Sequence, residues 1–249
     1  MTPPINGPTT GDEQPSFPPL LKGEETLPGM DPFAKAVASA ALGAEPGLIC
    51  WARDQATLRA ALVLAPEAPL ERAVGITFAV ALGLGDALGA LAPPEVAVHY
   101  VWPGAFKVNG ADCGAMRAAA STTDPAAVPD WLVIGIEIPY SHPPASAASD
   151  GEPGNRPGQT YLIEEGCVEV TPLKLLDSWA RHTLVWINRW LDDGFQPLHA
   201  AWRERAWEMG EDLPEGGTFM GLDELGGMLV KTATATEIHP LTTLLEDLS

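Results

Sequence analysis

Two side chains in the middle of the chain, Lys107 and Cys113, have the chemistry of a group-transfer site. A lysine ammonium can bind a carboxylate or a phosphate, and a cysteine thiolate can carry an acyl group. Such a thiolate needs a nearby cation or base that lowers its pKa, and Arg117 is the nearest cation along the chain. The alternatives are a solvent-facing strand lysine and a buried, apolar cysteine.

A second group of residues suits the binding of a small molecule. Trp51 and Trp102 offer apolar surface and Gln55 a polar anchor, which is the usual composition of a small-molecule pocket. Arg53 is a candidate partner for a ligand carboxylate. The same residues also fit a packed core and a surface ion pair, and the sequence leaves both interpretations open.

Cysteine and histidine spacing gives no indication of a metal site. The 3 cysteines and 5 histidines are scattered, and no pair has the spacing of metal ligands. An odd number of distant cysteines also indicates no disulfide framework. We therefore expect no bound metal.

The charge balance limits the partners of this protein. The net charge is -19, from 14 Lys and Arg against 33 Asp and Glu, so nucleic acid and anionic membrane surfaces should repel the chain. Scarce cations also argue against an ATP site, since phosphates are usually met by Lys, Arg or a metal. No apolar run approaches the ~20 residues of a membrane span and residues 1–14 lack signal-peptide features, so a cytoplasmic protein is expected.

The elements that must position these side chains alternate between strands and helices. We predict an α+β fold with a mostly antiparallel or mixed sheet, because hairpins connect the strands as often as helices do. Expected strands cover residues 47–53, 58–65, 96–101, 106–108, 113–118 and 131–138, followed by a hairpin over 218–232. One helix is expected to begin at Asp31-Pro32, and three others to cover residues 70–91, 171–192 and 197–209. Residues 139–160 are expected to form a long loop.

Composition divides the chain into three parts. Residues 1–30 are rich in Pro, Gly, Thr and Glu and are predicted to be an extended arm, with Phe17, Leu20 and Leu21 adding an edge to the body. Residues 31–212 would form the main domain, and residues 213–249 a small C-terminal β domain.

Three segments resemble the biotin/lipoate protein ligase superfamily. Residues 49–55 are similar to a strand ending in Ala-x-x-Gln, and 133–138 to a Val-Gly-Ile-Gly-x-Asn strand. Residues 102–114 resemble the superfamily's Lys-Trp-Pro-Asn-Asp and Gly-x-Lys-x-x-Gly motifs. The order of elements from about residue 30 onward agrees. The resemblance implies a ligase-like fold and adds further candidate ligand-binding residues: Pro103, Asn109, Gly110 and Gly114.

The same segments depart from the superfamily where charge is needed. Val101 and Ala111 stand in place of the two motif lysines, and Gly104-Ala105 in place of the Asn-Asp pair. Pro139 stands in place of the strand's asparagine. After Gln55 the next strand follows almost at once, so the Gly-Arg-Gly-Arg loop that would close over an acyl-adenylate is missing.

These departures predict a ligase-like protein that has lost acyl-adenylate formation and serves as a small-acid-binding or accessory protein. Biotin, lipoate or octanoate would be the ligand rather than ATP, and an acyl-carrier or biotinyl-type domain the protein partner. One alternative is an active biotin, lipoyl or octanoyl transferase, in which Lys107→Ala or Cys113→Ala would abolish transfer. Another is a structural module, such as a homodimer, built on helices whose tryptophans recur at helical spacing: Trp179, Trp186, Trp190, Trp202 and Trp207.

Overall fold

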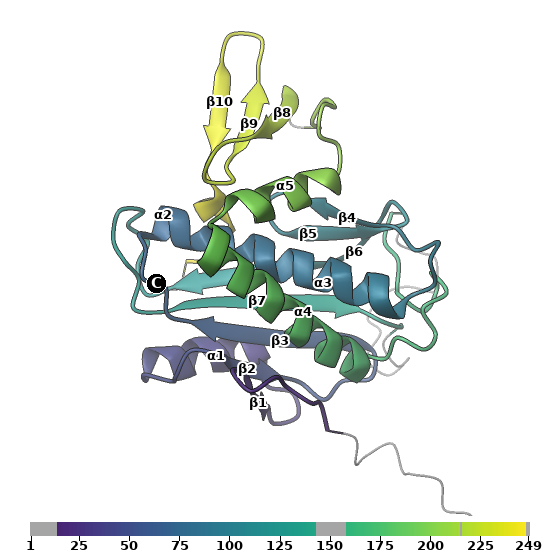
Figure 1. Ribbon diagram of the computed structural model, residues 1–249. Helices are drawn as coiled ribbons and strands as arrows, with labels where there is room; N and C mark the ends of the chain where they lie inside the picture. Colours follow the sequence, from purple (N-terminus) through teal and green to yellow (C-terminus); the bar gives the residue numbers. More distant parts are fainter. Residues whose placement is uncertain (1–13, 143–157, 215, 248–249) are drawn as a thin grey trace, which may run out of the picture.

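The computed structural model describes residues 14–142, 158–214 and 216–247. Its body is a seven-stranded sheet, and a separate three-stranded sheet stands at one end of it (Figure 1). In spatial order the strands of the large sheet are β1 (Lys22–Glu25), β2 (Leu48–Trp51), β3 (Thr57–Leu64), β7 (Leu132–Pro139), β6 (Ala111–Ala120), β5 (Ala105–Val108) and β4 (Val98–Val101). β1 runs parallel to β2 and all other neighbours are antiparallel. The predicted α+β class is confirmed.

Helices cover the two faces of this sheet unequally (Figure 1). One face is covered by a long helical segment and two later helices: α2 (Leu70–Ala73), the 3-10 turn η1 (Val74–Ile76), α3 (Thr77–Leu91), α4 (Pro172–Asp193) and α5 (Gln196–Glu204). The other face carries the short helix α1 (Pro32–Ala41) alone among the described helices. Residues on the two faces form separate buried clusters.

The segment Leu70–Leu91 is long and apolar enough to cross a membrane, contrary to the sequence expectation. However, 78% of its most apolar window is buried inside the protein, which is the situation of a core helix. Apolar residues on all sides suit a helix that lies between the sheet and α4. Gly83 allows the closest approach, since a Cβ there would lie 2.2 Å from Thr183 Oγ1.

Helix α1 shields part of its face of the sheet. Asp31 caps the helix by accepting a hydrogen bond from the backbone N–H of Phe33, and Pro32 occupies the first turn, as the sequence predicts. Phe33 packs over Gly135, where a Cβ would approach its ring to 2.8 Å. The remainder of this face, toward the start of β3 and the end of β7, carries polar and charged side chains.

The C-terminal unit consists of β8 (Thr218–Leu222), β9 (Met228–Lys231) and β10 (Thr236–His239), followed by the 3-10 turn η2 (Leu241–Leu244). The predicted hairpin is therefore present, whereas β10 was not predicted because it is short, polar and exposed. The chain then returns to the body. Leu245 pairs with Ala118 of β6, and Glu246 donates its backbone N–H to the carbonyl of the same residue.

Tertiary pairing moved two predicted boundaries. Helix α5 ends at Glu204 instead of residue 209, because Trp207 donates its backbone N–H to Tyr100 of β4 and Tyr100 donates to Arg205. β1 does add an edge strand from the N-terminal arm, but it uses residues 22–25 rather than Leu20 and Leu21. The divisions at residues 30 and 212 stay predictions, and most of the predicted 139–160 loop lies outside the described residues.

Candidate functional site

The partly uncovered face of the sheet carries two cavities, of about 280 Å³ and about 420 Å³. The smaller lies between residues 26–29 and the β2–β3 connection, and the larger between β6, β7 and residues 159–161. Arg59 lines the smaller cavity, and Arg117 and Glu137 line the larger. All three side chains also line the narrow space between the cavities. We call this continuous surface the trough.

Strand register brings these charged residues together. Arg59 of β3 lies directly opposite Glu137 of β7, which in turn lies opposite Ala115 of β6. Successive side chains of a strand point to opposite faces of the sheet. Leu58 and Ala60 of β3 therefore face the core, whereas Arg59 between them faces the trough. A central part of the sheet thereby presents a polar surface.

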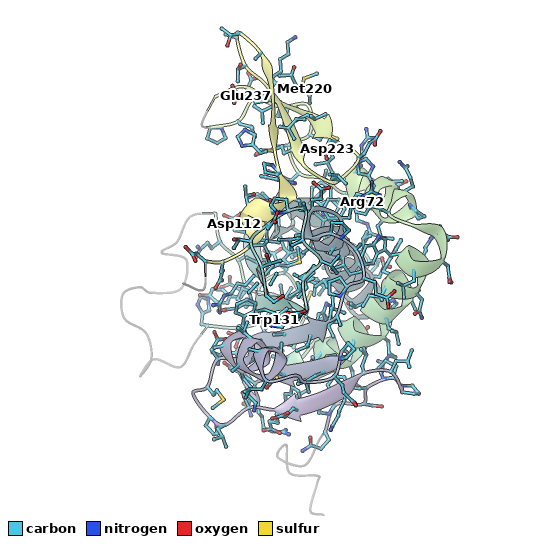
Figure 2. All side chains as sticks on the ribbon, turned by 90° about the vertical axis from the view of Figure 1, so that its left-hand side faces the viewer. Arg72, Asp112, Trp131, Met220, Asp223 and Glu237 are labelled. Atoms are coloured by element: carbon cyan, nitrogen blue, oxygen red, sulfur yellow. The ribbon has the colours of Figure 1, made fainter. Side chains whose placement is uncertain are left out.

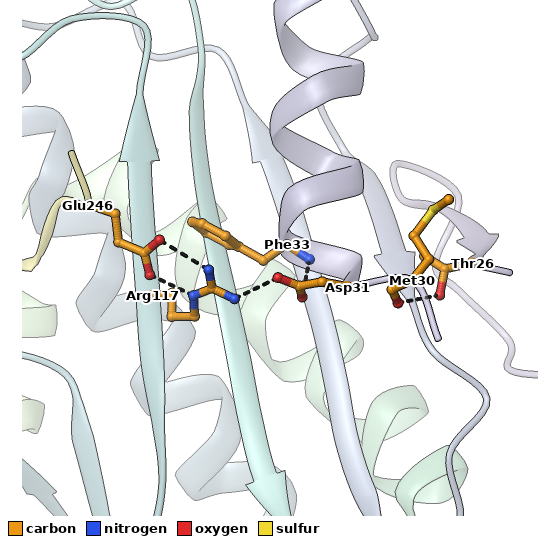
Figure 3. A network of polar contacts seen from close by, with 6 residues as sticks. All are labelled: Thr26, Met30, Asp31, Phe33, Arg117 and Glu246. Carbon is orange, nitrogen blue, oxygen red and sulfur yellow. Dashed lines mark hydrogen bonds and ion pairs between the residues drawn. The ribbon is translucent and has the colours of Figure 1, made fainter. Parts of the chain in front are cut away.

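Arg117 holds three segments together in the trough (Figure 3). Its guanidinium forms two hydrogen bonds with the Glu246 carboxylate, of 2.6 and 3.1 Å, and one of 2.8 Å with Asp31. It also lies 4.3 Å from the centre of the Phe33 ring. The hydrogen bonds to Glu246 and then to Asp31 raise the pKa of Arg117 against the effect of burial. This network joins β6, helix α1 and the C-terminal segment.

Asp31→Asn isolates the charge of this network, since asparagine caps a helix as well as aspartate does. Burial tends to raise the pKa of Asp31, but hydrogen bonds from Arg117 and the Phe33 N–H outweigh it and the pKa is lowered. A lowered folded-state pKa gives stability that is present above the unfolded pKa and lost as pH falls through the folded value. We expect urea unfolding at pH 7 to show a loss of about 0.5–1 kcal/mol that disappears in strong acid.

The control for this prediction is Asp31→Ala, which also removes the helix cap. It should cost about 1 kcal/mol more than the asparagine variant, at acid and neutral pH alike. An asparagine variant whose deficit is the same at both pH values would contradict the assigned ion pair.

The other cations near the trough are also paired with carboxylates. Each pair is formed by residues that are close along the chain or on neighbouring elements, at N–O distances of 2.6–3.0 Å: Arg53 with Glu25, Arg59 with Asp54, and Lys107 with Asp112. The hydrogen bond from Arg53 lowers the pKa of Glu25. The cations of this surface are therefore largely neutralised from within the chain.

Three of the predicted ligand-binding residues do line the trough. Arg53 and Gln55 line the smaller cavity and Gly114 the larger. Trp51 is buried on the helix-covered side, 2% exposed, with the Arg53 guanidinium carbon 5.2 Å from its ring centre. The Trp51 ring therefore packs against the Arg53 guanidinium and does not line the trough itself.

The remaining predicted residues lie elsewhere. Trp102 and Pro103 follow β4, at the opposite edge of the sheet from Trp51, and Trp102 Nε1 donates to the carbonyl of Gly226 at 3.0 Å. Asn109 and Gly110 form the β5–β6 turn in positive-φ conformations. The structure therefore separates Trp102 from Gln55, and the predicted three-residue pocket does not form.

Lys107 and Cys113 lie outside the trough. Lys107 pairs with Asp112 at 2.6 Å and lies over the Trp207 ring, 5.3 Å from its centre. Cys113 is 1% exposed and faces the core, where burial above all raises its pKa to about 12. Their roles in acyl transfer stay predictions, and these surroundings favour neither an activated thiolate nor an available ammonium.

All three cysteines are buried, and burial raises the pKa of each thiol. We expect the native protein to react with Ellman's reagent at pH 8 at least about 10²-fold more slowly than the denatured protein, in which all the thiols should titrate rapidly. Rapid labelling of the native chain that Cys113→Ser abolishes would contradict this prediction and would restore Cys113 as an acyl carrier.

Arg59 and Glu137 were not predicted as site residues, and Arg117 was considered only as a cation near Cys113. Each is a charged residue within an otherwise apolar or alanine-rich strand, and that is the signal that could have revealed them. A charge in a central strand requires a face without a covering helix. In the part of the chain that the structure describes, no group of three or more His, Cys, Asp or Glu is arranged to hold a metal.

Two of the degenerate motif positions line the trough, namely residues 52–56 and Pro139. Residues 52–56 alone connect β2 and β3, and Asp54 closes this short loop by accepting from the Ala56 N–H at 2.8 Å. Gly104 packs against Leu244 of the C-terminal segment. A Cβ added at Gly104 would lie 2.8 Å from a methyl carbon of Leu244. The connection between β2 and β3 therefore contains no long glycine- and arginine-rich loop.

Residues 17–204 match the Biotin/lipoate A/B protein ligase family. The chain belongs to this family. The superfamily membership predicted from the motifs is thus confirmed, and the small C-terminal sheet follows the matched region.

Two kinds of family relative are similar to this chain. A biotin–[acetyl-CoA-carboxylase] ligase of Paracoccus denitrificans is 26% identical over 197 residues, covering 76% of this chain and 80% of the relative. A biotin protein ligase-like protein of unknown function from a Silicibacter species has a solved structure with a TM-score of 0.85 and 47% identity, covering 94% and 100% of the two chains. The Aquifex aeolicus biotin protein ligase in complex with biotin and ATP shares the fold, with a TM-score of 0.65, 17% identity and coverage of 88% and 94%.

Proposed function

We propose that this family member does not form an acyl-adenylate and instead binds a small molecule in the trough, as a binding or accessory protein. The observation that carries this proposal is the β2–β3 connection, which consists of residues 52–56 alone. A loop of this length has too few backbone N–H groups and cations to enclose a phosphate.

The electrostatics of the trough support the same proposal. Its cations are engaged by carboxylates of the same chain, as in the bidentate pairing of Arg117 with Glu246. An entering phosphate would have to displace these carboxylates or meet their repulsion. Ala111 and Gly104 provide no replacement charge at the motif positions.

The ligand and partner classes come from the family. Relatives are named as biotin ligases, and one is solved with biotin and ATP, so biotin, lipoate and octanoate are the first ligands to test. A biotinyl-type or acyl-carrier domain is the corresponding protein partner. We propose a cytoplasmic location, as such substrates imply.

Isothermal titration with ATP, biotin, lipoate and octanoate tests the loss of the nucleotide site. We expect no saturable ATP binding below about 1 mM, with or without each acid, because the cations of the trough within the described residues are already paired with carboxylates. Saturable ATP binding in the low micromolar range, or biotinylation of an acceptor domain, would reject the proposal.

A further inference from the structure

One carboxylate in the larger cavity has no partner among the described residues. Two acidic residues of the described part of the chain line this cavity, Asp112 and Glu137. Asp112 is paired with Lys107. Glu137 is exposed, and within residues 14–142, 158–214 and 216–247 it forms neither a hydrogen bond nor an ion pair. Its charge is therefore available to a ligand in the cavity.

The neighbouring cations are not arranged to neutralise Glu137. Arg59 lies opposite it in the register, yet its guanidinium is bound to Asp54 at 3.0 Å. Arg117 is shared between Asp31 and Glu246, so this cation is surrounded by more negative than positive charge. Both arginines are held away from Glu137 by partners within the chain, and the cavity has a negative field.

The position of Glu137 also distinguishes it from an ordinary surface acid. It lies in the central strand β7, with β3 on one side and β6 on the other. Beside it, Gly114 has φ of +97°, and a Cβ there would lie 2.2 Å from the Glu137 carbonyl oxygen. A glycine is required here because β6 runs so close to the backbone of β7 that a side chain would collide with it.

Apolar and uncharged polar groups complete the lining of the cavity, the polar ones being Thr57, Gln159 and Thr160. Ala115 and Pro139 lie on the floor, and Tyr161 forms part of the wall, with its ring 4.0 Å from that of His142. The volume of about 420 Å³ is that of a small-molecule site. Such surroundings favour a ligand with a short hydrocarbon part in addition to the group that meets the carboxylate.

We propose that this cavity binds a small primary amine, with its ammonium group on the Glu137 carboxylate and its hydrocarbon part against Ala115, Pro139 and Tyr161. The inference rests on the proposed small-molecule-binding function and replaces a carboxylic acid with an amine as its ligand. An acid would place like charges together, whereas an ammonium gains a charge-assisted hydrogen bond. A single available carboxylate is too few ligands for a divalent cation.

Titration calorimetry with hexylamine, hexanoate and 1-hexanol, three probes of matched length, tests this assignment. Hexylamine should bind at least about tenfold more tightly than hexanoate, with 1-hexanol between them, because the three probes share a six-carbon chain and differ in the charge and hydrogen bonding of the head group. Glu137→Gln, which keeps the size of the side chain, should weaken hexylamine by about tenfold and leave 1-hexanol unchanged. The amine affinity should also fall as salt is added.

Glu237→Gln is the matched control. Glu237 is an exposed acid on β10, in the C-terminal sheet and away from Asp112 of the cavity (Figure 2). This variant should bind hexylamine as the unmodified protein does. Because Glu137 is exposed, the thermal unfolding temperature of its glutamine variant should be unchanged, which separates lost binding from lost folding.

Three results would overturn the inference: no saturable hexylamine binding up to about 10 mM, hexanoate binding as tightly as hexylamine, or full amine affinity in Glu137→Gln. These results leave the proposed function standing if ATP still fails to bind. Saturable ATP binding would instead reject the proposed function, whatever the amine does.

Discussion

Exchange of pyrophosphate into ATP, the signature of adenylate formation, is expected to be at least about 10³-fold slower in this protein than in an adenylating biotin ligase. Removing one preorganised donor to a developing charge typically costs about 10²–10³ in rate. Between β2 and β3 this chain has residues 52–56 in place of the long Gly-Arg-Gly-Arg loop, and it has Ala111 in place of the motif lysine and Gly104-Ala105 in place of the Asn-Asp pair. Such losses do not add, so the expected deficit is a lower bound.

The measurement is isotope exchange between labelled pyrophosphate and ATP, with biotin, lipoate or octanoate as the acid. The Paracoccus denitrificans biotin ligase is the positive control, since it is similar over most of both chains. Ala111→Lys supplies the missing motif lysine, and we expect it to stay inactive because the loop is still absent. Exchange within about tenfold of the control enzyme would disprove the loss of adenylation.

Replacing Gly83 with alanine is expected to lower the free energy of unfolding by about 2 kcal/mol. Helices α3 and α4 meet at this glycine. A Cβ would lie 2.2 Å from Thr183 Oγ1 and 2.7 Å from both Thr183 N and Cα, and the backbone atoms cannot turn away as a flexible side chain could. The helices would have to separate, and this cost exceeds the ~1 kcal/mol that alanine gains over glycine in a helix.

Gly89→Ala is the matched control, because it lies in the same helix and a Cβ there meets nothing within 4 Å. It should leave stability unchanged or raise it by about 0.5–1 kcal/mol. Thermal unfolding measures both variants. For a chain of this size, the Gly83 variant should unfold about 4–8 °C lower. Equal unfolding temperatures for the two variants would show that the α3–α4 contact is looser than described.

The sequence by itself predicted most elements of this fold, because their signals are local. Asp31-Pro32 begins α1 through a side-chain cap and a fixed φ, and Thr171-Pro172 begins α4 in the same way. Asn109-Gly110 forms the predicted hairpin turn, with both residues at positive φ. The motif order also identified the family correctly, since motif positions depend on chain order and not on packing.

Local signals were insufficient where one segment pairs with a distant one. The end of α5 depends on Tyr100, more than a hundred positions earlier, and Trp102 is bound by Gly226 of the C-terminal unit. Trp51 and Trp102 both looked like pocket residues, yet strand order places Trp51 on β2 and Trp102 after the edge strand β4, with four strands between β2 and β4. Strand order is a long-range property that the spacing of two tryptophans does not contain.

The candidate site shows the same division. The sequence alone showed uncharged residues, Val101 and Ala111, at the positions that the resemblance assigns to the motif lysines, and a short segment after Gln55. The tertiary structure alone decided which charges remain at the site and which are neutralised. It paired Arg117 with Asp31 and Glu246, from opposite ends of the chain, and left Glu137 without a partner among the described residues. Coulombic pairing depends on distance in space, and only folding brings those groups within reach of one another.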